Sequence, residues 1–200
     1  MYVVIAEAVS DIDCLKILIR RLANNKSISI EGKGYGSCGD MLNKGAALLK
    51  SYCKQKEFRK FIVCYDRDNE GSSQKRYEQV ISKIITPSGI KKPENLICIL
   101  IPTEEIEAWI LADVQAISKV FSSWETEKEF LHPETIISPK EKLKRLINAD
   151  KPRPLYSGTK DNEKIVNFLN LDVVKKKCPS FSELADFVEN DIANYPNKKN

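Results

Sequence analysis

Acidic side chains follow three of the segments that the sequence predicts as β-strands. Glu7 comes directly after the apolar run at 2–6, and Asp11 opens the helix expected next. Asp66 and Asp68 come directly after a second apolar run, FIVCY. The acids that follow the run LICILIP are Glu104, Glu105, Glu107 and Asp113. Because ligands of open α/β sheets bind beyond the carboxyl ends of the strands, we expect these acids to gather at one edge of a sheet.

This set of side chains favours a divalent metal ion with oxygen ligands. Carboxylates without imidazole or thiolate suit Mg²⁺ or Mn²⁺, and acids that share such an ion promote phosphodiester chemistry. Each acid taken alone is better explained as a helix cap or turn residue, but the joint pattern favours a metal site. We therefore expect Glu7, Asp66 and Asp68 as ligands. Possible additional site acids are Glu105, Glu107 and Asp113.

The remaining composition excludes several other kinds of site. His132 is the single histidine, and the six cysteines form neither a CxxC nor a CxxH motif. A zinc hydrolase or a histidine-based triad is therefore not expected. A GxGxxG pattern begins at Gly34, but it lacks the strand-end acid of a dinucleotide site. We expect a loop beside the acidic edge, in which Lys33 contacts a phosphate.

The order of the predicted elements indicates an α/β fold. The predicted strands are 2–6, 27–32, 61–66 and 96–102, and the helices between them are 11–22, 39–54 and 73–85. This alternation predicts a largely parallel four-stranded sheet flanked by helices. Strand signals stop after Thr103, which is expected to cap a helix. The later predicted helices are 104–113, 114–121, 138–148, 159–169 and 180–193. We expect a core at 1–113 and a helical C-terminal extension, 114–200, packed on it.

Charge and hydropathy suggest where such a protein would work. Lysine and arginine number 32 against 28 acids, a net charge of +4. No apolar run approaches the roughly 20 residues of a membrane span, and no basic segment precedes the first strand, so we expect a cytoplasmic protein without a membrane partner. Scattered bases around an acidic pocket suit a nucleic-acid backbone.

Several stretches of the sequence resemble a known family. IAEAVSD and YDRDNEG resemble the two signature motifs of Toprim domains, the Mg²⁺-binding catalytic folds of topoisomerases, DnaG-type primases and OLD-type nucleases. IPTEEIEAWILAD, PKEKLKRL, PLYSGTK and CPSFSEL resemble small Toprim-like proteins that are often encoded beside an ATPase in anti-phage or mobile elements.

The resemblance implies a role for each matching residue. Glu7 would be a metal ligand or general acid/base, and Asp66 and Asp68 would be metal ligands. Asp11 matches an acid that OLD-type members add, and Lys160 matches their late lysine, which stabilises charge on the phosphate. The glycine that usually follows the glutamate is Ala8 here, which is expected to hinder a tight backbone turn.

The sequence thus favours a Mg²⁺- or Mn²⁺-dependent nuclease that acts on DNA or RNA, with an ATPase as a possible partner protein. Because a weakly basic monomer of this size has little surface for grasping a duplex, we also expect a homodimer or a heteromer. Two alternatives remain open. One is a non-catalytic partner subunit of an ATPase, which the departure at Ala8 favours. The other is a metal-dependent phosphatase or phosphotransferase with a small substrate.

Overall fold

Four parallel strands form the centre of the molecule. The computed structural model describes residues 1–55, 60–67, 72–121, 129–148 and 156–194. The strands are β1 (Tyr2–Ala6), β2 (Ile30–Gly34), β3 (Lys60–Cys64) and β4 (Ile97–Leu100). Their order across the sheet is β2-β1-β3-β4, and every neighbouring pair is parallel. The predicted α/β class and the parallel four-stranded sheet are therefore confirmed.

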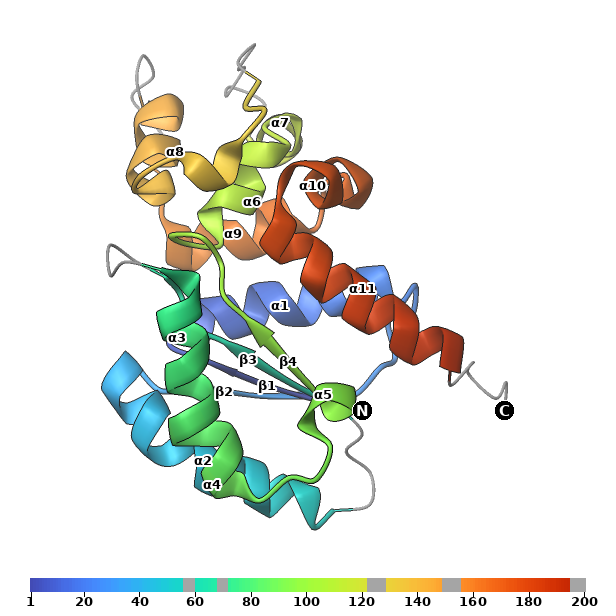
Figure 1. Ribbon diagram of the computed structural model, residues 1–200. Coiled ribbons are helices and arrows are strands. Elements are labelled where there is room, and N and C mark those ends of the chain that lie inside the picture. Colours follow the sequence, from blue (N-terminus) through green and yellow to red (C-terminus); the bar gives the residue numbers. More distant parts are fainter. Residues whose placement is uncertain (56–59, 68–71, 122–128, 149–155, 195–200) are drawn as a thin grey trace.

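Helices cover both faces of this sheet (Figure 1). The helices of the first half are α1 (Val9–Leu22), α2 (Cys38–Cys53), α3 (Ser73–Val80), the π-helical turn η1 (Ile81–Ile85), α4 (Thr86–Ser88) and α5 (Pro93–Leu96). Those of the second half are α6 (Glu107–Ala112), α7 (Gln115–Val120), the 3₁₀ turn η2 (Pro133–Thr135), α8 (Pro139–Asn148), α9 (Gly158–Val166), α10 (Leu171–Lys177) and α11 (Pro179–Asn194).

Strand periodicity explains the two layers. Successive side chains of a strand point to opposite faces, so Val3 and Ile5 pack under α2, α3 and η1, whereas Val4 and Ala6 pack on the side of α1 and the C-terminal helices. All five residues of β1 are buried. Burial of both faces is the reason that β1, β3 and β4 are continuous apolar runs, whereas the edge strand β2 is mostly exposed.

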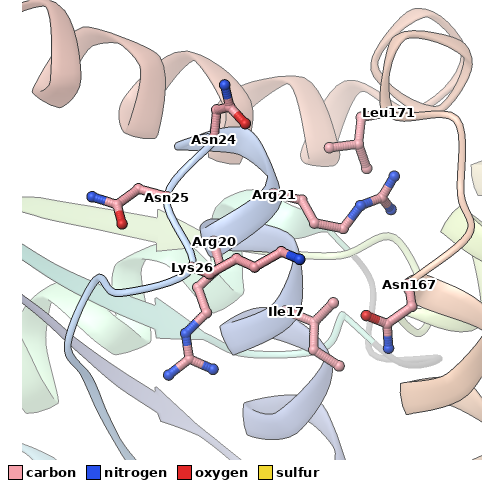
Figure 2. A pocket seen from close by; sticks show the side chains of 8 residues that line it. All are labelled: Ile17, Arg20, Arg21, Asn24, Asn25, Lys26, Asn167 and Leu171. Carbon is pink, nitrogen blue, oxygen red and sulfur yellow. The ribbon is translucent and has the colours of Figure 1, made fainter.

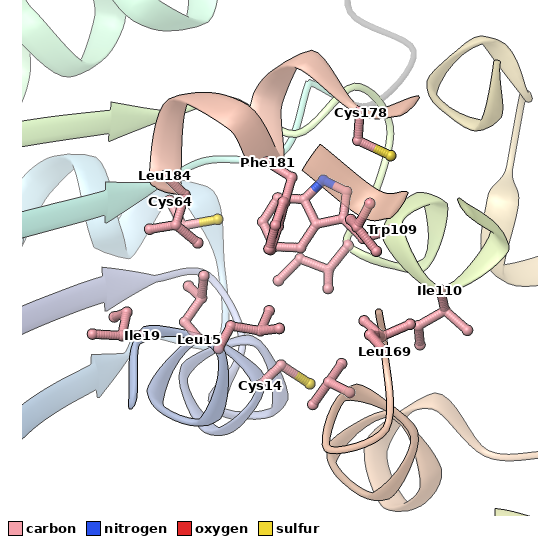
Figure 3. Close-up of a cluster of buried hydrophobic side chains, with 14 of the residues drawn as sticks. Cys14, Leu15, Ile19, Cys64, Trp109, Ile110, Leu169, Cys178, Phe181 and Leu184 are labelled. Carbon is pink, nitrogen blue, oxygen red and sulfur yellow. The ribbon is translucent and has the colours of Figure 1, made fainter. Parts of the chain in front are cut away.

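The C-terminal helices share one hydrophobic core with the sheet (Figure 3). Trp109 of α6 and Phe181 of α11 are fully buried and meet edge to face, with their ring centroids 5.3 Å apart. Leu15 of α1 and Cys64 of β3 belong to the same cluster. The helical half therefore packs on the α1 face of the sheet, while the expected boundary at residue 113 stays a prediction.

The segment after β4 differs from the expectation. The helix predicted from residue 104 begins only at Glu107, and Thr103 does not cap it. Glu104 has a φ of 72°, in the left-handed region, and its buried Oε1 accepts a hydrogen bond from Arg67 Nη2 at 2.7 Å. The buried ion pair with Arg67 holds this residue in a conformation that a helix excludes. The sequence prediction also missed α10.

No helix in the described ranges is both long enough and apolar enough to cross a bilayer.

The loop after β2 holds the turn between β1 and α1. The backbone N–H groups of Tyr35 and Gly36 both donate to the carbonyl oxygen of Glu7, at 3.0 and 2.7 Å. Gly34 makes this approach possible, because a Cβ there would lie 2.7 Å from the backbone nitrogen of Val9. Gly34 and Gly36 of the GxGxxG pattern therefore allow the loop after β2 to contact the turn between β1 and α1.

We predict that Gly34→Ala lowers the free energy of unfolding by about 1–3 kcal/mol, because backbone atoms have to shift to admit the methyl group. Urea denaturation measures the loss. Gly39→Ala is the matched control, since a Cβ at Gly39 meets no heavy atom within 4 Å. Equal stability of the two variants would contradict the close packing of these loops.

Candidate functional site

An acidic pocket lies at the carboxyl edge of the sheet, where the strand order reverses. β1 is flanked by β2 and β3, so the chain leaves β1 toward one side and β3 toward the other. Such a reversal opens the crevice in which doubly wound α/β proteins bind ligands. The pocket has a volume of about 210 Å³. It is lined by Glu7, Ala8, Ser10, Asp11, Gly36, Asp66, Glu105, Glu107, Lys140, Gly158 and Thr159.

Five of the acids singled out from the sequence line this acidic pocket. They are Glu7, Asp11, Asp66, Glu105 and Glu107. They come from the β1–α1 turn, the end of β3 and the segment that leads into α6. Asp68, the second acid of the expected pair, lies outside the described residues. Within the described ranges, no three His, Cys, Asp or Glu side chains are arranged so that they already hold a metal ion.

Three other candidates do not line the pocket. Asp113 ends α6, and its Oδ2 accepts a hydrogen bond from the backbone nitrogen of Asn170 at 2.6 Å, which joins α6 to the start of α10. Lys33 is exposed on β2, with its ammonium 5.9 Å from the centre of the Tyr35 ring. Lys160 is exposed on the first turn of α9. Their positions give Asp113 a structural role and leave both lysines in solvent.

Ala8 does not distort the turn that carries Glu7. Its backbone has φ −104° and ψ 154°, an extended conformation that alanine adopts without strain. Ala8 is the residue that precedes α1, and its N–H donates to Asp11 Oδ2 at 3.3 Å. The expectation that alanine hinders this turn is therefore wrong.

Burial and neighbouring charges in the pocket change the pKa of Asp11. Burial raises the pKa of its carboxyl from 3.8 to about 6, and the negative charge of Glu107 adds to the rise. The hydrogen bond from Ala8 and the positive charge of Lys140 lower the pKa by less. Burial also raises the pKa of two neighbouring thiols. The negative charge of Asp11 adds to the rise at Cys14, and that of Asp66 adds to the rise at Cys64. The pocket is a region of concentrated negative charge.

Glu107 is fixed by a buried chain of polar groups. Asn162 Nδ2 donates to Glu107 Oε1 at 2.9 Å, and the hydroxyl of Tyr156 donates to Asn162 Oδ1. Only 7 % of Glu107 is exposed. Gly158 permits this close packing, because a Cβ at that position would lie 2.9 Å from Glu107 Oε1. The N-terminal end of α9 therefore supports one wall of the pocket.

Lys140 is the cation that faces the acids. It is the one positively charged residue in the lining of the pocket, as far as the described residues show. Its backbone nitrogen donates to Glu105 Oε2 at 3.1 Å, so the start of α8 is anchored at the same edge. Sequence reasoning missed Lys140, Thr159 and Asn162. Only the position of Lys140 at the start of a predicted helix distinguishes it from the other lysines of PKEKLKRL.

The fold and the site define a doubly wound α/β protein with an acidic pocket at its topological switch point. The chain belongs to the family described as "Domain of unknown function (DUF4276)", whose model matches residues 10–189. No curated protein and no solved structure matches the chain. The matched range contains four of the pocket acids and Lys140, while Glu7 precedes it. The Toprim resemblance stays a prediction.

We predict that Asp11→Asn stabilises the metal-free protein above pH 6. In the folded state the raised pKa means that ionisation of Asp11 costs free energy. This penalty is absent below pH 4, grows as pH rises from about 4 to 6 and is complete above that range. The variant should gain about 1–3 kcal/mol at pH 7.5 and nothing at pH 3.5. Thermal unfolding in a chelator across this pH range measures the difference.

Asp13→Asn is the control, because Asp13 lies on the same helix with 42 % of its side chain exposed, in an ion pair with Lys16. A pH-independent difference between Asp11→Asn and wild type would contradict the electrostatic description of the pocket.

Proposed function

We propose that the protein is a Mg²⁺- or Mn²⁺-dependent nuclease that hydrolyses phosphodiester bonds of DNA or RNA. The observation that carries the proposal is the convergence of five carboxylates and Lys140 in one pocket at the switch point of the sheet. Five negative charges against one positive charge leave a net charge of −4 when every group is ionised. A divalent cation would relieve this repulsion, and all-oxygen donors are those that Mg²⁺ prefers.

Each side chain has a task in this proposal. Glu7 and Asp66 would hold the metal ion together with Asp68, which follows Asp66 by two residues. When bound, the ion supplies Lewis-acid polarisation of the phosphoryl group. Asp11, with its pKa of about 6, is suited to accept a proton from the attacking water near neutral pH. Lys140 would stabilise the negative charge that develops on the phosphate, the role that the sequence assigned to Lys160.

The size of the pocket favours a polymer over a small substrate. Sites that enclose a small molecule have volumes of about 300–1,000 Å³. A volume of about 210 Å³ admits a phosphate group and its metal ion but leaves the rest of the substrate outside. This geometry suits a phosphodiester presented by a long strand, and it disfavours the phosphatase alternative.

The proposal extends to the biological setting that the sequence suggests. It includes a cytoplasmic location, an ATPase partner, a homodimer and a role in anti-phage defence. These parts rest on the resemblance and the composition. The docking-subunit alternative rests on the departure from the family pattern at Ala8, although the unstrained backbone of Ala8 leaves the turn that carries Glu7 intact.

We predict metal-dependent cleavage that requires Asp66. Wild type is incubated with plasmid, single-stranded DNA, RNA and a generic phosphomonoester, in Mg²⁺, Mn²⁺ or chelator. Asp66→Asn should lower the rate of nucleic-acid cleavage at least 100-fold, because a ligand carboxylate is lost, whereas Asp13→Asn should retain the rate. Mg²⁺ or Mn²⁺ should raise the melting temperature of wild type but not that of Asp66→Asn.

Metal-dependent stabilisation without cleavage of any nucleic acid would overturn the nuclease. Hydrolysis of the phosphomonoester alone would identify the phosphatase, and stabilisation without any hydrolysis would identify the docking subunit.

We also predict that the two candidate lysines differ. Lys140→Gln should lower kcat about 10- to 1,000-fold with little change in KM, because the positive charge acts on the transition state. Lys160→Gln should stay within about threefold of wild type, since Lys160 is exposed outside the pocket. Steady-state kinetics on the best substrate compares them. A larger loss for Lys160→Gln would restore the assignment made from the sequence.

A further inference from the structure

A second hollow lies at the other end of α1. This basic pocket, of about 840 Å³, is lined by Ile17, Arg20, Arg21, Asn24, Asn25, Lys26, Asn167 and Leu171 (Figure 2). Its walls come from the last turns of α1, the loop that leads toward β2, and the segments that end α9 and begin α10. Because α1 starts at the carboxyl edge of the sheet and runs back, the basic pocket opens near the amino edge.

The lining has the composition of an anion site. It contains three cationic side chains and three carboxamides, and no acid is among the lining residues that the structure describes. Ile17 and Leu171 supply apolar contact area. A hollow with this lining presents N–H donors and positive charge together, the combination that binds phosphate groups.

Arg21, one of the three cationic side chains, already forms hydrogen bonds within the protein. Arg21 donates from Nη1 to the carbonyl oxygen of Val166 and from Nη2 to that of Leu169, each at 2.6 Å. These bonds tie the end of α9 to α1 and hold the guanidinium in place. Arg21 therefore shapes the wall of the basic pocket, and the other two cations are those that can turn to a ligand.

Arg20 and Lys26 carry the positive charge that remains. Arg20 Nε is buried and has no hydrogen-bond partner in the part of the chain that the structure describes. A buried donor left without an acceptor destabilises the fold, and an anionic ligand that accepts from it would recover this loss. Lys26 is exposed at the rim of the pocket. Neither side chain forms an ion pair within the described ranges.

The helix ends do not cancel this charge. The C-termini of α1 and α9 both lie near the basic pocket, and each contributes about half a negative charge. With the carboxylate of Asp113, which acts on Arg21, their sum is about two negative charges against three positive ones, and Arg21 already satisfies carbonyls at the end of α9. The pocket therefore keeps a positive potential.

α1 joins the basic pocket to the acidic pocket along one face. Ser10 lines the acidic pocket and Ile17 lines the basic one, and residues seven apart lie on the same face of a helix. At 1.5 Å per residue, Ser10 and Arg20 are about 15 Å apart along the axis. Neighbouring phosphates of one duplex strand are ~7 Å apart through space, because each step combines about 3.4 Å of axial rise with a rotation around the axis, so this separation corresponds to about two phosphate steps.

We propose that the basic pocket binds a backbone phosphate of the same nucleic-acid strand whose scissile phosphodiester lies in the acidic pocket, about two phosphates away. This inference rests on the proposed nuclease function and names the second contact of its substrate. The spacing of the two pockets would then set the shortest strand that the protein holds at both points.

Fluorescence anisotropy with labelled oligonucleotides in Ca²⁺ or chelator measures binding apart from cleavage. Arg20→Gln/Lys26→Gln should weaken binding of a 20-nucleotide strand at least 10-fold at 0.1 M salt. It should also reduce the slope of log K against log salt concentration by about one, because one phosphate contact is lost. Dinucleotides should bind wild type and variant equally, because they cannot span both pockets.

Lys44→Gln/Lys83→Gln is the matched control. It removes the same net charge from exposed positions on α2 and η1, which cover the opposite face of the sheet. It should bind the strand like wild type. Lys26→Glu alone, at an exposed position, gives the same test if Arg20→Gln impairs folding, and a melting curve checks each variant.

Equal losses in the control and in Arg20→Gln/Lys26→Gln would overturn the inference, because the effect would then reflect net charge alone. A thermal-shift arm with inorganic phosphate and ATP separates a strand phosphate from a free nucleotide. Stabilisation by ATP through Arg20 and Lys26, without competition from the oligonucleotide, would also overturn it. Failure of the nuclease itself shows separately, as absent cleavage by a protein whose strand binding still depends on these two residues.

Discussion

Mutual repulsion among the carboxylates of the acidic pocket is the constraint on which the rest of the structure depends. Five acids share a hollow of about 210 Å³, and the pKa of Asp11 is raised there by burial, with a smaller contribution from the negative charge of Glu107. The helical half provides the groups that make this gathering tolerable. Lys140 supplies a positive charge from the start of α8, and Asn162 donates to Glu107 from α9. The C-terminal helices are therefore part of the site as well as part of the core.

Buried acids elsewhere in the molecule show that burial alone does not mark a site. Asp191 accepts a hydrogen bond from the hydroxyl of Tyr2 at 2.7 Å and lies 3.9 Å from Lys60 Nζ. Glu134 accepts from Trp109 Nε1 and from Ser180 at the start of α11. In these cases one acid meets dedicated donors and joins two elements. The acidic pocket differs because five acids line one hollow, although Asp11, Glu105 and Glu107 also accept hydrogen bonds there.

Local sequence patterns explain why much of the fold and of the acidic pocket was predictable from the sequence. Continuous apolar runs predicted β1, β3 and β4, while β2 begins and ends later than the predicted 27–32. Acids placed after the apolar runs identified most of the acidic pocket, because carboxyl ends of parallel strands must share an edge. The features that the sequence did not predict depend on tertiary contacts. Glu104 has a left-handed backbone conformation and pairs with Arg67. Glu105 and Glu107, rather than Glu104, line the pocket. Lys140 reaches the site through the packing of α8, and no local pattern distinguishes it from Lys160.

The charges of α1 serve the helix and the surface together. Asp11 lies in its first turn and Arg20 and Arg21 in its last, which is the distribution that the helix dipole favours. The same residues place negative charge at the carboxyl edge of the sheet and positive charge about 15 Å away. A net charge of +4 conceals this polarity, because it averages two regions of opposite sign. A strand held at the basic end would be kept from the acidic end by repulsion unless a cation intervened there. In the proposed nuclease, the division of charge along one helix would make strand binding and metal binding interdependent.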